Sequence, residues 1–336
     1  MAAARQMFAG VFRQLDLPVD LSLDGVVLEG EVILPEQRGR VKISVNGGGL
    51  VADREGRFTV TAAAALADPA VSSVEVKGGV VAAMATPRSF GRFVFQLDAS
   101  ARGTRFPQGV GLRADLSASR TSAGEAYNAV VVADGRNLLD LRAELPPGGP
   151  GLTGAWKLDV RDTDLVPFSL GVPLPEFAAT GEGGLDADAA FAAIHVHGRL
   201  DATVDRWHVL RPELAAVGKL NVAADFDLTE QGGTLGVRKL DVAIRGHSPI
   251  AEIRTLQAFD FTPATRELRT ADMERELFGL GLQGVPVDWL RPWVSTVQVS
   301  GGRLRGGLTA RAHEGGVSLR ATSPLTVDEI GIFQSG

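Results

Sequence analysis

The chain has 336 residues, of which 45% are hydrophobic and 22% are charged, and its formal net charge at pH 7 is -6. This balance is typical of a folded protein and excludes intrinsic disorder. Basic residues are interspersed with acidic ones, so no segment forms a surface for a phosphate backbone, and we expect no nucleic-acid partner. The absence of cysteine excludes disulfides, thiolate catalysis and cysteine-ligated zinc.

Residues 1–17 place large apolar side chains on one side of a short expected helix: Met7, Phe8, Val11, Phe12 and Leu15. The segment lacks the unbroken apolar core of a signal peptide and the ~20 apolar residues of a membrane-spanning helix. No other stretch reaches that length. Two interpretations stay open: the protein is cytoplasmic, or the chain is a piece of a longer one whose targeting segment is missing.

An apolar residue at every second position is the dominant pattern from there to the end of the chain, and it predicts strands with one apolar and one polar face. The stretches that follow it are residues 40–46, 93–98, 110–119, 137–145, 155–160, 193–204, 217–228 and 239–244. Turn dipeptides that tolerate positive φ lie between the strands. They are Asp24-Gly25, Asn46-Gly47, Asp134-Gly135 and Gly232-Gly233. We expect about fifteen strands in antiparallel hairpins and less than about a fifth helix.

Two segments rich in proline and large apolar residues interrupt this pattern, at residues 166–177 and 285–294. Each is followed by a strand-like run with a glycine pair, Gly183-Gly184 and Gly301-Gly302. Their separation of about 120 residues indicates a weak internal repeat around residues 166–200 and 285–312. Because proline cannot donate to a strand ladder, single-turn helices or caps at a sheet edge would suit these segments.

A sheet with one apolar face must hide that face from water. A second layer can cover it, as in a sandwich. A bilayer can cover it if the sheet closes into an outer-membrane β-barrel, but the single tyrosine and four tryptophans give no aromatic girdle. A third solution is an open trough that is filled by a ligand with long hydrocarbon tails.

Residues 172–191, 212–228 and 287–312 carry a resemblance. Their long alternating strands, their proline-rich Leu/Trp segments and the glycine pairs that lead into the next strand resemble the AsmA-like superfamily of bacterial envelope lipid-transfer proteins, to which TamB, YhdP and YdbH belong. The likeness lies in this repeat-like patterning and not in a specific motif, and it covers about two thirds of the chain.

This resemblance implies a periplasmic β-groove, anchored to the inner membrane, that conducts or shields phospholipid acyl chains between the inner and outer membranes. It also implies a protein without catalytic residues or cofactors. The N-terminal anchor of the superfamily is missing here, which again points to a segment of a longer groove or to a protein partner that pairs end to end.

We therefore predict an all-β fold: an elongated, twisted antiparallel sheet with a few short helices, curved into an open apolar groove over residues 1–336. The residues expected to line the groove are Val41, Ile43, Val45, Phe93, Phe95, Leu97, Ile194, Val196, Leu200, Leu220, Val222, Phe226, Leu228, Leu240, Val242 and Ile244. The alternative is a structural or adhesive β-protein whose apolar face is buried in its own core.

His195 and His197 are the one pair that suggests a metal site, with His208 nearby in the sequence. Both histidines fall on the polar face, and no carboxylate follows at a spacing typical of a metal-binding motif. Because a metal needs a complete set of ligands, we predict solvated surface histidines and no metal. No nucleophile elbow or zinc-protease motif occurs either.

Overall fold

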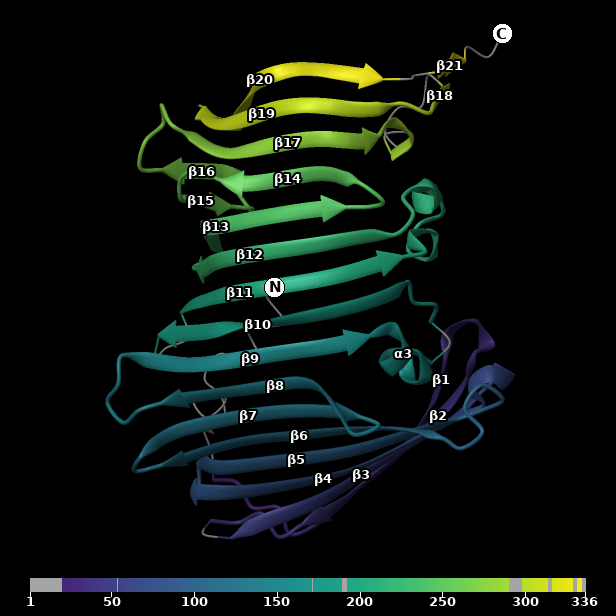
Figure 1. The fold of residues 1–336 in the computed structure, drawn as a ribbon. Helices are drawn as coiled ribbons and strands as arrows, with labels where there is room; N and C mark the ends of the chain where they lie inside the picture. Colours follow the sequence, from purple (N-terminus) through teal and green to yellow (C-terminus); the bar gives the residue numbers. More distant parts are fainter. Residues whose placement is uncertain are drawn as a thin grey trace. The chain divides into compact units, whose positions relative to one another are not determined.

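The computed structural model describes residues 20–52, 54–170, 172–188, 192–289, 298–313, 316–328 and 331–333. Strands account for 70% of the structure and helical segments for 8%, and one open antiparallel sheet holds 19 strands (Figure 1). The prediction of an all-β fold with a few short helices is confirmed. None of the helices in the described ranges is long and apolar enough to cross a membrane. The short helix expected within residues 1–17 lies outside the described residues.

Contact density divides the chain into two units. The first comprises residues 1–173 and 185–192, and the second comprises residues 174–184 and 193–336. The expectation of a single continuous groove over residues 1–336 stays a prediction, and each unit is described by itself below.

Nine strands of the first unit pair antiparallel, each with the next one along the chain. They are β1 (Val26–Ile33), β2 (Gly39–Gly48), β3 (Glu55–Leu66), β4 (Ser73–Thr86), β5 (Ser89–Arg102), β6 (Val110–Thr121), β7 (Gly124–Ala133), β8 (Arg136–Leu145) and β9 (Gly151–Arg161). The helical segments are η1 (Pro35–Gln37), η2 (Pro69–Val71), α3 (Asp162–Leu165) and η3 (Val166–Phe168). This meander needs no crossover connection, because each pair of strands forms a hairpin.

The second unit continues in the same way, with one branch. Its strands are β11 (Ala193–Asp205), β12 (Leu220–Gln231), β13 (Thr234–Arg245), β14 (Pro249–Thr255), β15 (Phe259–Thr262), β16 (Glu267–Thr270), β17 (Glu276–Pro286), β19 (Arg303–His313) and β20 (Gly316–Asp328), with the separate pair β18 (Gln298–Ser300) and β21 (Gly331–Phe333). Strand β10 (Glu176–Asp188) contributes residues to both units. Strand β13 pairs with β14 and with β15, and β14 pairs directly with β17. Two short helices, η4 (Trp207–Val209) and η5 (Pro212–Ala216), connect β11 to β12.

Every stretch predicted from alternation lies within a strand except residues 217–228, because β12 begins at Leu220 and the three residues before it follow η5. The count of about fifteen was too low, because some strands do not alternate large apolar residues along their whole length; in β3, whose sequence is EGRFTVTAAAAL, four consecutive alanines interrupt the pattern. Asp134-Gly135 and Gly232-Gly233 form the predicted tight turns, with positive φ at both residues of each pair. The predicted turn at Asn46-Gly47 is wrong. Both residues lie inside β2, where a Cβ on Gly47 would come within 2.3 Å of the Arg57 carbonyl oxygen, so glycine there permits close strand packing.

Two buried clusters close the strand ends of the first unit. One contains Leu50, Ala82, Met84, Phe90 and Ala118. The other contains Ala64, Val71, Val74 and Ala101 at the opposite ends of β3, β4 and β5, and Phe168 and Leu170 pack against it. Phe168 and Leu170 follow β9, so the sheet of the first unit must curl until the chain after its ninth strand contacts its third to fifth strands.

The proline-rich segment at residues 166–177 therefore begins as the predicted cap at a sheet edge. Its first residues form η3, directly after α3. The matching segment of the expected repeat, residues 285–294, lies largely outside the described residues. The internal repeat thus stays a prediction.

Leu277 on β17 is the largest fully buried aliphatic side chain among the described residues, with 0% exposure. We predict that Leu277→Ala lowers the free energy of unfolding by about 2–5 kcal/mol, because it removes apolar contacts and leaves a cavity. Leu319→Ala on β20, where leucine is 63% exposed, should change it by less than about 0.5 kcal/mol. Urea denaturation followed by far-UV circular dichroism measures both, and equal losses would contradict the assigned burial.

Candidate functional site

One face of the sheet in the first unit carries an unbroken row of apolar side chains. Residues directly opposite each other in paired strands project to the same side of a sheet. The register therefore joins one residue from each strand, β2 to β9, in the row Val45, Val60, Gly78, Leu97, Ala114, Val131, Leu139 and Leu158. We call the side of the sheet that carries this row the apolar face.

The second unit carries the same kind of row. Its register joins Leu200, Ala224, Val242, Ile253, Leu280, Leu308 and Ala321, one residue each from β11, β12, β13, β14, β17, β19 and β20. Parallel rows lie on either side of it, because Val196 faces Leu228 and Ala202 faces Val222. The alternation in the sequence is thus in phase from strand to strand.

The register places all sixteen predicted lining residues on the apolar face of their own unit. Val41, Ile43 and Val45 face Ala64, Ala62 and Val60 on β3. The three residues of β5 face Ala82, Val80 and Gly78 on β4. On β11 to β13, Val196 faces Leu228, Phe226 faces Leu240 and Val222 faces Ile244, whereas Ile194 faces Glu230. Leu220 is buried, at 6% exposure, and the other fifteen are half-buried. That these residues contact lipid stays a prediction.

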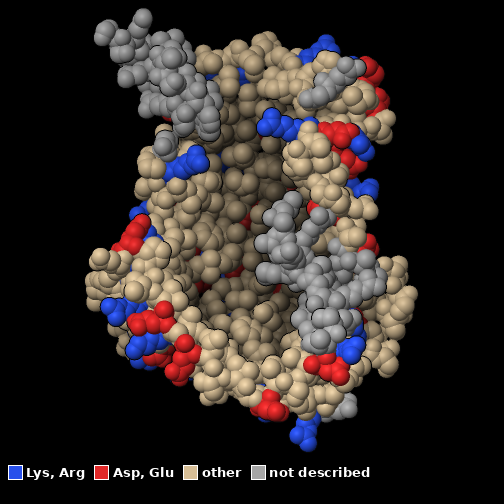
Figure 2. Space-filling model, turned by 180° about the vertical axis from the view of Figure 1, so that it is seen from behind, with Lys and Arg blue, Asp and Glu red and all other residues tan. Residues whose placement is uncertain are grey.

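The apolar faces are not sealed by a second layer of the described strands. Fifteen of the sixteen predicted lining residues keep part of their surface accessible, which a sealed second layer would prevent. Figure 2 shows one face of the molecule, on which most Lys, Arg, Asp and Glu lie along the margins and mostly uncharged residues lie between them. Half-buried apolar residues on an unsealed sheet face leave room for a hydrocarbon ligand.

The opposite, polar face carries the charged pairs. On β12, Asp225 accepts a hydrogen bond from Lys239 Nζ at 2.6 Å, and Arg199 Nε lies 3.7 Å from the same carboxylate oxygen. The hydrogen bond from Lys239, together with the positive charges of Lys239 and Arg199, lowers the pKa of Asp225 below its ordinary value. These ion pairs are solvent-accessible, so they contribute little to the free energy of unfolding, and their main effect is to keep this face of the sheet polar and hydrated.

One concavity of the first unit is a different feature. It has a volume of about 750 Å³ and is lined by residues of β1 to β4, among them Glu29, Glu31, Lys42, Glu75 and Lys77. Charged side chains of both signs suit water and ions better than acyl chains. We therefore regard the apolar faces, and not this concavity, as the candidate site for an apolar ligand.

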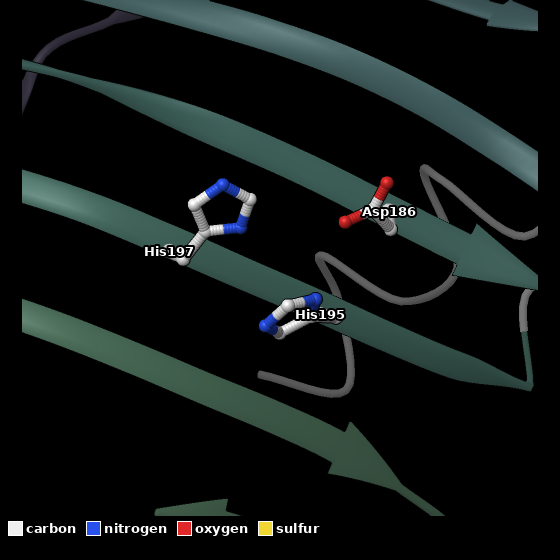
Figure 3. A group of neighbouring side chains, drawn as sticks. All are labelled: Asp186, His195 and His197. Carbon is white, nitrogen blue, oxygen red and sulfur yellow. The ribbon is translucent and has the colours of Figure 1, made fainter. Parts of the chain in front are cut away.

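A second group of interest is a cluster of two histidines and an aspartate. His195 and His197 project from β11 and Asp186 projects from β10, and one possible ligand atom from each lies within 4.8 Å of the others (Figure 3). His195 Nε2 also lies 2.9 Å from Asp227 Oδ1 on β12. His208 is not a member of this group; it belongs to η4.

Sequence spacing could not reveal these carboxylates. Asp186 lies nine residues before His195, and Asp227 reaches His197 only through the register of β11 with β12, in which the two residues are directly opposite. The prediction that both histidines occupy the polar face is confirmed by that register. No carboxylate lies at a motif-like spacing from them in the sequence, yet Asp186 and Asp227 lie beside them in the structure, because strand pairing makes neighbours of residues that no local motif connects.

Comparisons with protein-family models, with curated proteins and with solved structures found no match to this chain. The resemblance to the AsmA-like superfamily therefore stays an expectation that rests on the pattern of strands, proline-rich segments and glycine pairs in the sequence. The function of the site is inferred from its geometry.

Proposed function

We propose that this protein binds the acyl chains of phospholipids along its apolar faces, and that it conducts or shields them without catalysis. The observation that supports this proposal best is the continuous row of apolar and small residues in each unit, most of them half-buried, from Val45 to Leu158 and from Leu200 to Ala321. A small polar ligand would gain nothing from such a surface. A long hydrocarbon chain can follow it from strand to strand.

The expected gain in free energy is sufficient for binding. Burial of one methylene group contributes about 0.8 kcal/mol, so an acyl chain of about sixteen carbons, half covered, contributes about 6 kcal/mol. Two such chains contribute about 12 kcal/mol, which is comparable with the ~4–15 kcal/mol lost to translational and rotational freedom. Such a balance favours reversible occupancy, which transfer of lipid requires.

The wider setting of the proposal is the bacterial envelope. A groove for acyl chains would act in the periplasm, between the inner and the outer membrane, with one membrane at each end. A protein partner that pairs end to end is compatible with the edge strands. On β1, Val27 and Ile33 are 73% and 70% exposed, and on β20 Leu319 is 63% exposed. Exposed apolar edge strands are sites where another strand can add.

The competing hypothesis is a structural or adhesive protein whose apolar face belongs to its own core. The buried clusters around Phe90 and around Ala101 support it locally, because they fill the strand ends of the first unit. They do not include the middle row of Val45, Val60 and Leu97. The two hypotheses therefore differ in what occupies the middle of the face.

The first test is the lipid content of the purified protein. We predict that native mass spectrometry, after purification in a detergent-free buffer, detects phospholipid on the full chain, and that lipid extraction lowers the melting temperature, since a ligand bound only to the folded state stabilises it. A chain that carries no lipid and takes up none from phosphatidylethanolamine vesicles would contradict the proposal.

The second test places a charge on each face of β12. We predict that Phe226→Glu, on the apolar face, lowers the lipid count per chain while the fold survives, because the carboxylate can reach water in an open trough. In a sealed core the same carboxylate would be buried without a partner, and that penalty of several kcal/mol would consume most of a typical stability of about 5–15 kcal/mol. Melting temperature and lipid count are measured together.

Asn221→Glu is the matched control on the polar face of the same strand. Asn221 is exposed and lies directly opposite Arg245, so the new carboxylate gains an opposite charge. We expect wild-type lipid content and stability for this variant. Unfolding of Phe226→Glu, combined with a wild-type protein that never carries lipid, would leave the structural β-protein as the better hypothesis.

A further inference from the structure

The two histidines of β11 form a pair that can chelate. They are separated by one residue on a strand, so both side chains project to the same face. Their ring centroids lie 5.1 Å apart. Since Ile194 and Val196 occupy the apolar face, this pair lies on the polar side of the sheet, away from the proposed lipid site.

Asp227 is placed to orient one ring of the pair. Its Oδ1 lies 2.9 Å from His195 Nε2. When Nε2–H donates to that carboxylate, Nδ1 becomes the nitrogen that carries a lone pair. A carboxylate that fixes the tautomer of a metal-binding histidine in this way is the usual outer partner of a zinc ligand.

Gly184 on β10 leaves the space that the other ring occupies. A Cβ at this position would lie 2.3 Å from Cε1 and 2.5 Å from Nε2 of His197. These distances are far shorter than a van der Waals contact, so any larger residue would displace the imidazole. Strand β10 therefore has no side chain at the position where the imidazole ring of His197 lies.

We propose that His195 and His197 bind one Zn²⁺ ion, with the carboxylate of Asp186 as a third ligand and Asp227 as the positioning residue behind His195. Imidazole and carboxylate donors suit zinc, whereas Mg²⁺ and Ca²⁺ prefer sites made of oxygen alone. Zinc bonds of about 2.1 Å place tetrahedral ligand atoms about 3.4 Å apart. The three donors already lie within 4.8 Å of one another, so side-chain rotations would close the site.

The chemistry also fixes the pH dependence. A proton and a metal ion compete for the same imidazole nitrogen, so zinc affinity falls as the pH is lowered. With three protein ligands, a water molecule would complete the tetrahedron.

The experiment is a zinc titration of the full chain by calorimetry at pH 7.5 and pH 5.5, with MgCl₂ as the comparison salt. We expect one Zn²⁺ per chain at pH 7.5, weaker binding at pH 5.5 and no saturable heat with Mg²⁺. His195→Ala and His197→Ala should each lower the affinity more than 100-fold. Asp227→Asn and Gly184→Ala, which remove no metal ligand, should lower it about 10–100-fold.

His247→Ala is the matched control, because His247 is exposed and lies in the turn between β13 and β14; it should bind like wild type. Circular dichroism of every variant separates lost binding from lost fold. The proposal is overturned if wild type shows no saturable zinc binding, if folded His195→Ala and His197→Ala bind like wild type, if His247→Ala loses the ion, or if Mg²⁺ binds equally well.

Discussion

The antiparallel backbone ladder imposes the constraint on which the other features depend. In register, residues that face each other across two strands project to the same side of the sheet, so an apolar row persists only if every hairpin keeps the phase of its partner. A register shift of one residue in any strand would expose the apolar side chains of that strand to water. The row from Val45 to Leu158 shows that eight consecutive strands keep this phase.

In the second unit, a β-bulge changes the pairing of β12 with β13 at one position. Between Asp227 and Leu228 the register of β12 with β13 shifts by one residue, so that Phe226 faces Leu240 while Leu228 faces Val237. This bulge turns Val237 toward the apolar face, although strict alternation from Leu240 would have turned it away. A bulge thus extends the apolar surface where the sequence pattern alone would end it.

The two faces of the sheet divide the chemistry of the protein. The apolar side has alanine and glycine among its larger residues, and its buried clusters are confined to strand ends in the first unit. The polar side collects ion pairs such as Lys239 with Asp225, and it carries the histidine pair. A ligand on one face and a cation on the other would therefore bind without competing for residues, and each proposal can fail without the other.

The sequence by itself determined the fold class, the strands with large alternating residues and the face on which each side chain lies, because a period of two is a local property of an extended backbone. It therefore placed Phe226 and Leu228 on one side and His195 and His197 on the other. Only the tertiary structure decided which strands are neighbours, where a bulge changes the phase, and how the first unit curls until Phe168 reaches the end of β5. It also decided that Asp186 and Asp227 lie beside the histidines. Those contacts depend on the register of paired strands, which is set by turn geometry and packing over the whole sheet, and no local spacing encodes them.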